Sequence, residues 1–227
     1  MTGEKPTPND DRATEYSFFP SDPKKLKARI RSYERALVKD ASDGYGKRYL
    51  LGPMYLLLSD IEGALRHYAW FEATYPDDGG EPYHRLLWAL TLFKGGSREA
   101  ADRRLRDALY QNLYLIPHVL GMNIPPYPIW HSSNLAEPAY AEELPLELLA
   151  LWDAQAKTWA RAFYESPSTQ PDLKRYLDLQ IRMKNERPGP KRAALLEEIW
   201  GISNPDGAER RAESLGRLRL LPGGRTG

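Results

Sequence analysis

Four segments between residues 46 and 113 carry apolar residues at the three- and four-residue spacing of an α-helix. The first pair covers about 46–58 and 60–74, and the break that ends it is the sequence PDDGG at 76–80. A second pair follows, with GGS at 95–97 as its internal turn. Since no stretch of the chain alternates with period two for long enough to predict a sheet, the pattern predicts helical hairpins in series.

Helices are also predicted on both sides of these hairpins. Leu26, Ile30 and Leu37 lie on one apolar stripe of an expected helix at 23–39. The segment 113–145 contains six prolines and little periodicity, so we expect a long ordered loop there. The helices expected beyond it cover about 145–165, 171–186, 190–200 and 206–219.

The expected fold class is all-α, organised as one domain. The 227 residues, 41% of them hydrophobic, suffice for one sizeable core. The polar, proline-broken segment 1–20 is predicted to be a disordered tail, 21–220 a single helical domain and 221–227 a flexible tail. Within the domain, Ser59 and Glu62 have the spacing of a capping box, so Ser59 is expected to cap a helix.

The two hairpins repeat with a period of 37 residues, because Gly52 and Ala64 recur as Ala89 and Ala101. The first copy fits the pattern L-G-x-x-Y…A-x-x-x-F…P at Leu51, Gly52, Tyr55, Ala64, Tyr68 and Pro76. Small residues at such positions let neighbouring helices approach closely. The segment 46–113 therefore resembles the tetratricopeptide repeat (TPR) family. The resemblance implies a short right-handed α-solenoid of stacked hairpins, capped by the proline-rich loop and the C-terminal helices.

The resemblance also implies a non-catalytic scaffold or adaptor, because TPR proteins hold an extended peptide or another protein on a concave surface. In this register the partner-binding groove is lined by Tyr49, Leu56, Tyr83, Leu86, Leu90 and Phe93. It lacks the lysines and asparagines with which some family members clamp an acidic chaperone tail.

An exposed apolar groove of this kind favours aggregation, so we expect it to be covered by a protein partner, by a second copy of the chain or by the chain itself. Self-occupancy by 113–140 or by a C-terminal helix is favoured, because the prolines hold 113–140 extended. Its aromatic side chains Tyr114, Tyr127 and Trp130 are the expected anchors.

Nucleic-acid binding by the basic ends of the chain is the second interpretation. Residues 22–40 contain seven Lys/Arg against three Asp/Glu, whereas 41–169 contain eleven against sixteen. The candidate contacts to a polyanion are Lys24, Lys25, Lys27, Arg29 and Arg31, with Arg210, Arg211, Arg217 and Arg219 at the C-terminal end. The net charge of +1 and the lack of a known DNA-reading motif place this function second.

An enzyme with its site in the loop 127–134 is the third interpretation. The loop gathers Trp130, His131 and Asn134 around two serines. Adjacent residues rarely form a catalytic set, and no nucleophile motif surrounds them, so we expect no catalysis. The spacing of the four histidines and the lack of a glycine-rich phosphate loop likewise predict no metal, no cofactor and no small-molecule ligand.

Composition points to a reducing compartment. The chain contains no cysteine, which rules out disulfides and thiolate metal sites. The longest apolar run, 49–58, is too short to span a bilayer, and 1–20 holds no apolar signal region. We therefore expect a cytoplasmic protein without membrane contact.

Overall fold

Helices make up the structure, joined mostly by short turns and by one longer loop at 120–133. The computed structural model describes residues 18–43 and 46–205, and within these ranges it contains eleven α-helices, one 3-10 helix (η1) and no strand. The elements are α1 (Pro23–Lys39), α2 (Lys47–Leu57), α3 (Ile61–Thr74), α4 (Pro82–Lys94), α5 (Arg98–Gln111), α6 (Leu115–Val119), η1 (Asn134–Ala136), α7 (Pro138–Glu142), α8 (Leu146–Leu149), α9 (Ala154–Tyr164), α10 (Thr169–Asn185) and α11 (Pro190–Ser203). The predicted all-α class is confirmed.

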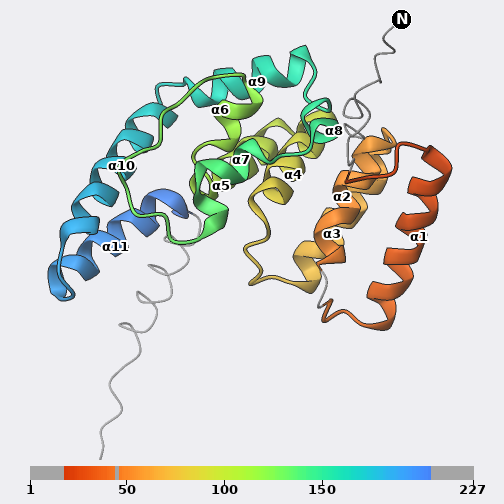
Figure 1. Ribbon diagram of the computed structural model, residues 1–227, viewed down its shortest axis with the longest axis horizontal. Helices are drawn as coiled ribbons and strands as arrows, with labels where there is room; N and C mark the ends of the chain where they lie inside the picture. Colours follow the sequence, from red (N-terminus) through yellow and green to blue (C-terminus); the bar gives the residue numbers. More distant parts are fainter. Residues whose placement is uncertain (1–17, 44–45, 206–227) are drawn as a thin grey trace, which may run out of the picture.

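The two predicted hairpins are α2–α3 and α4–α5, and they lie side by side. Helix α4 packs against both α2 and α3, and α1 packs against the open side of α2. In Figure 1 the helices follow one another from α1 at one edge of the molecule to the α10–α11 hairpin at the other. This order means that contacts form mainly between elements near in sequence.

Small residues lie where these helices touch. A Cβ atom added to Gly52 in α2 would lie 2.4 Å from the hydroxyl oxygen of Tyr68 in α3, so only glycine permits this approach. Ala64, Ala89, Ala101 and Ala108 have no exposed surface. The side chains expected to be close-contact points are therefore buried between helices, and Pro53 is buried beside Gly52 in an α2 that continues through it.

The start of α3 differs from the predicted capping box. Asp60, not Ser59, is the N-cap, and its side chain accepts a hydrogen bond from the Gly63 N–H at 2.8 Å. Ser59 has a φ of 57° and forms the turn before the cap. The prediction was off by one residue because both residue types favour the N-cap position.

The proline-rich region is more helical than predicted, and the helix expected at 145–165 is broken. The side chain of Asn112 accepts hydrogen bonds from the N–H groups of Tyr114 and Leu115, which begins α6 inside the expected loop. Further along, Asp153 accepts from the Ala156 N–H at 2.9 Å and starts α9 as a separate helix after α8. The predicted helix 206–219, most of the tail 1–20 and the tail 221–227 lie outside the described residues.

Candidate functional site

The predicted concave groove is covered by the chain itself at its three leucines, whereas Tyr49 and Tyr83 line an open pocket of about 380 Å³. Leu56, Leu86 and Leu90 are buried. Helices α6 and α9 pack against α4, and α8 packs against α2. These three leucines are therefore not accessible to a partner, which corrects the predicted groove.

The aromatic members of the predicted groove have partners within the chain. Phe93 stacks on Trp159 of α9, with ring centroids 4.3 Å apart and planes at 2°. The backbone N–H of Tyr83 donates to the hydroxyl of Tyr140 in α7 at 3.4 Å. The Tyr49 hydroxyl donates to the carboxylate of Asp78 at 2.8 Å. The side chains of Phe93 and Tyr49 therefore make contacts within the fold, and Tyr83 does so through its backbone.

The loop 127–134 uses its polar groups to hold its own shape. Nε2 of His131 lies 3.1 Å from the hydroxyl oxygen of Tyr114, and the same oxygen accepts the Tyr127 N–H at 2.9 Å. Trp130, an expected anchor, is 55% exposed. Asn134 is exposed and begins η1. The structure therefore pairs the histidine with a tyrosine of the same region rather than with a serine nucleophile.

The predicted polyanion contacts lie along α1. Lys24, Lys25, Lys27 and Arg31 are exposed, and Arg29 is half-buried with its Nη1 donating to the Phe18 carbonyl at 3.3 Å. The arginines of the C-terminal end lie outside the described residues. The structure thus keeps the first set together on one helix.

An open groove of about 1050 Å³ lies on another face, between α3, α5 and the end of α11. We call it the α3–α5 groove. Its wall and floor are formed by Phe71, Glu72, Tyr75, Pro76, Asp77, Asp78, Gly79, Arg85, Trp88, Leu92, Ala100, Arg103, Arg104, Asp107, Tyr110, Gln111, Trp200, Ser203 and Asn204. A volume of this size can hold several side chains of an extended segment.

Trp88 of α4 is one of the residues that line the groove. One neighbour is the ring of Tyr68, stacked at 5.1 Å with planes at 9°. The guanidinium carbon of Arg104 lies 3.8 Å from the centroid of the indole, and that of Arg85 lies 5.4 Å from it. Two arginines are thus held next to one aromatic ring by cation–π attraction.

The charges of the groove are matched unequally. Arg104 pairs with Glu72 and, at 3.2 Å, with Asp107, and Asp78 pairs with Arg48 at 2.9 Å. Arg85, by contrast, forms no ion pair within the described residues. Most carboxylates of the wall are therefore already neutralised by arginines.

Arg85 donates from Nε to the Gly79 carbonyl and from Nη2 to the Asp78 carbonyl, both at 2.7 Å. Its Nη1 has no hydrogen-bond partner within residues 18–43 and 46–205. Burial, together with the nearby charge of Arg104, lowers the pKa of Arg85. The carboxylates of Asp107, Asp78 and Glu72 offset part of this effect, and the direct hydrogen bonds of Arg85 go to neutral carbonyl groups.

Two further polar atoms of the groove wall are buried without a partner in the described part of the chain, the hydroxyl of Tyr110 and Oε1 of Gln111. The Gln111 amide is oriented by its Nε2, which donates to the Gly79 carbonyl at 2.6 Å. Burial raises the pKa of Tyr110 to about 12, so its hydroxyl is neutral and can donate or accept. Buried polar atoms without partners are costly, and a ligand can relieve that cost.

A cluster of aromatic rings and two histidines lies beneath the groove. His84 has no exposed surface, and its ring lies 4.5 Å from that of Phe71 and 5.0 Å from that of Tyr68 between centroids. Burial lowers the pKa of His67 to about 4 and that of His84 well below its usual value. Both imidazoles are therefore neutral near pH 7, and the described residues contain no group of three metal-ligating side chains.

Comparisons with models of protein families, with curated proteins and with solved structures each give no match. Within the described ranges, no helix combines the length and the apolar character that crossing a bilayer requires. The arguments for function therefore come from the site alone.

Sequence reasoning missed the α3–α5 groove. Three of its lining residues are Arg85, Trp88 and Arg104, and the available signal was an arginine three residues before a tryptophan on one helix face. Arg104 joins them only because α4 and α5 pack closely. That contact depends on tertiary structure and not on local spacing.

Proposed function

We propose that this chain is a non-catalytic protein-interaction scaffold of TPR type that holds an acidic segment of a partner protein in the α3–α5 groove. The observation that carries the proposal is the open groove with Arg85 and Trp88 in its lining. The partner is assigned to this face because the chain's own helices cover Leu56, Leu86 and Leu90, which the TPR register assigns to a peptide.

The packing of the hairpins supports the TPR part of the proposal. In a TPR-type stack the first helix of each pair packs against both helices of the pair before it, as α4 packs against α2 and α3. Gly52 and the buried alanines occupy the close contacts that the repeat pattern requires. The helices from α9 onward then act as a cap for the last hairpin.

The groove lining holds four carboxylates and three arginines, and one of these groups, Arg85, favours an acidic segment. A carboxylate bound to Nη1 of Arg85 gains a charge-assisted hydrogen bond and offsets part of the repulsion between Arg85 and Arg104. The half-buried side chain of Leu92 offers contact to a neighbouring apolar side chain of the same segment, whereas Trp88 is 4% exposed and mainly holds the arginines in place. The partner is therefore expected to combine an Asp or Glu with apolar residues.

Filling the groove tests this proposal without removing any native contact. Ala100 lies half-buried in the groove wall on α5, and Ala162 lies exposed on α9. We expect Ala100→Trp to block the groove, whereas Ala162→Trp makes the same chemical change away from it. A random peptide library selected on the full chain supplies ligands, whose dissociation constants are then measured by fluorescence anisotropy.

The expected result is enrichment of acidic peptides that lose at least tenfold in affinity on Ala100→Trp and keep their affinity on Ala162→Trp. Enrichment of basic peptides, or ligands that bind both variants equally, contradicts the proposal. Circular dichroism of both variants establishes that each remains folded, so that a loss of binding can be assigned to the groove.

A further inference from the structure

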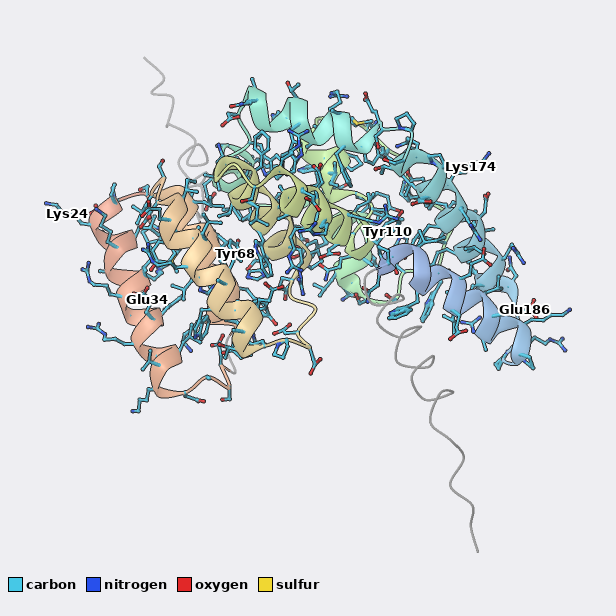
Figure 2. The ribbon with its side chains drawn as sticks, turned by 180° about the vertical axis from the view of Figure 1, so that it is seen from behind. Lys24, Glu34, Tyr68, Tyr110, Lys174 and Glu186 are labelled. Carbon is cyan, nitrogen blue, oxygen red and sulfur yellow. The ribbon has the colours of Figure 1, made fainter. Side chains whose placement is uncertain are left out.

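Helix α1 forms one edge of the molecule and turns a wide face to solvent. Its apolar side chains Leu26, Ile30 and Leu37 are buried against the rest of the chain. In Figure 2, Lys24 lies at the outer edge of the protein, on the side opposite Lys174 of α10. The charged face of α1 is therefore exposed along its length.

Seven cations lie on this 17-residue helix, and none of them forms an ion pair within the described ranges 18–43 and 46–205. They are Lys24, Lys25, Lys27, Arg29, Arg31, Arg35 and Lys39.

The nearby carboxylates make other bonds. Asp22 caps the helix by accepting the Lys24 N–H at 2.8 Å. Glu34 accepts the hydroxyl of Tyr55 from α2, and Asp40 accepts the Ser42 N–H at 2.9 Å. Seven cations thus face three carboxylates over residues 22–40, and none of these carboxylates forms an ion pair with a cation of α1 within the described residues.

Other helices of the same chain pair their cations with carboxylates four residues away. Arg66 lies 3.9 Å from Glu62, Arg103 lies 2.6 Å from Glu99 and Arg161 lies 3.1 Å from Glu165. In α1, by contrast, Lys27, Arg31 and Arg35 place like charges at successive four-residue steps. Such pairs destabilise a helix by about 0.2–0.5 kcal/mol each, so retaining them calls for a partner with negative charge.

Lys24, Lys27, Arg31 and Arg35 form one line, which we call the α1 ridge. Four residues rise about 6 Å along a helix, so the α1 ridge presents charges at regular short steps over about three turns. We propose that the α1 ridge binds the phosphate backbone of a double-stranded nucleic acid without reading its bases. This function adds to the proposed scaffold and does not rest on it.

The shape of the surface favours this ligand class over two others. A helix that lies on a membrane inserts its apolar face into the lipid, and the apolar face of α1 is already buried in the core. Binding of single strands relies on aromatic platforms for the bases, and Tyr33, the single aromatic residue of α1, is half-buried. Contacts to duplex phosphates need only a row of cations on a protruding element.

Titration of the full chain against a labelled mixed-sequence duplex, followed by anisotropy over a series of salt concentrations, tests the proposal. The slope of log K against log salt is about −0.9 for each phosphate contact, so four contacts give a slope of about −4. We expect the quadruple variant Lys24→Ala, Lys27→Ala, Arg31→Ala and Arg35→Ala to weaken binding at least tenfold and to bring the slope close to zero.

A charge-matched control removes two lysines and two arginines elsewhere. Lys157, Lys174, Arg182 and Arg187 are exposed on or next to α9 and α10. Their replacement by alanine changes the net charge equally and is expected to leave affinity and slope within twofold. Equal losses in both quadruple variants would mean diffuse attraction by net charge and would overturn the proposal.

Separate arms identify the ligand. Duplex DNA and duplex RNA are both expected to bind, because both present phosphate backbones. Tighter binding to single strands, binding to anionic lipid vesicles in place of duplexes, or no measurable binding at low salt each overturns the proposal. Ala100→Trp is expected to leave duplex binding unchanged, so a failure of the groove proposal and a failure of this one are distinguished.

Discussion

Replacing Gly52 by alanine tests the close contact between α2 and α3. The new Cβ would lie 2.4 Å from Oη, 2.5 Å from Cζ and 2.9 Å from Cε2 of Tyr68. The Tyr68 ring has 1% exposure and stacks on Trp88, so it has little space to move aside. The added methyl group therefore forces a shift of helix α2, of helix α3 or of both.

Two effects of opposite sign set the magnitude for Gly52→Ala. Replacing glycine by alanine in a helix interior stabilises by about 1 kcal/mol. Overpacking of a buried contact destabilises by about 1–3 kcal/mol, and three atom pairs closer than 3 Å place this site at the upper end. We therefore expect a net loss of about 2 kcal/mol in the free energy of unfolding.

Gly201 supplies a matched control, because it lies in α11 and a Cβ there would meet no atom within 4 Å. Gly201→Ala is expected to be neutral or to stabilise by up to about 1 kcal/mol. Urea unfolding followed by circular dichroism measures both variants. For a chain of this size, a loss of about 2 kcal/mol lowers Tm by about 4–8 °C.

The two outcomes for Gly52 separate the explanations. A stabilised Gly52→Ala protein, similar to Gly201→Ala, would show that α2 and α3 do not approach as closely as described. The reasoning about stacked hairpins would then be refuted at its central contact.

Two further predictions concern the histidine cluster and the start of α3. Stability is expected to fall as pH decreases from 6.5 to about 4, because unfolded His67 takes up a proton near 6.5 and folded His67 does so only near 4. This pKa difference corresponds to about 3 kcal/mol in the free energy of unfolding. Urea midpoints measured across that pH range should depend less on pH in His67→Gln than in the unchanged protein. An unchanged dependence would exclude His67 as the cause. At the start of α3, Asp60→Ala is expected to destabilise the protein by about 1 kcal/mol, because it removes the N-cap. Ser59→Gly relieves a positive φ and should stabilise the protein slightly. If thermal unfolding instead shows a loss of stability for Ser59→Gly and none for Asp60→Ala, Ser59 is the cap.

Local periodicity was enough to predict the paired helices of this chain, since α1 to α5 need only apolar spacing and turn residues. The starts of helices α6 and α9 were harder to predict, because each depends on one side chain that accepts a backbone hydrogen bond, Asn112 or Asp153. The prolines around α6 indicate a loop, and the leucines before α9 indicate a continuous helix. Neither of these side-chain acceptors could be recognised without knowing which backbone N–H groups are free. The small residues were informative because steric contact between helices depends mainly on side-chain size.

The candidate site could be predicted much less well than the fold. The TPR register identified Leu86 and Leu90 as groove residues, but it carries no information on which segment covers them. The α3–α5 groove depends on how Arg85 of α4 and Arg104 of α5 meet at Trp88. Of the α1 ridge, Lys24, Lys27 and Arg31 were predicted from the sequence as neighbours on one helix, whereas Arg35 was not included.

The two proposed surfaces share no residue, and this separation has a physical consequence. The α3–α5 groove takes negative charge at Arg85, while the α1 ridge takes it at Lys24, Lys27, Arg31 and Arg35. Because the two surfaces share no partner, substitutions in them are expected to change the binding free energies independently. A chain that holds both ligands also brings them together at a high effective concentration. An acidic segment long enough to extend from the groove to α1 would instead compete with the duplex, and the sign of the coupling between the two ligands therefore reports the path of the bound segment.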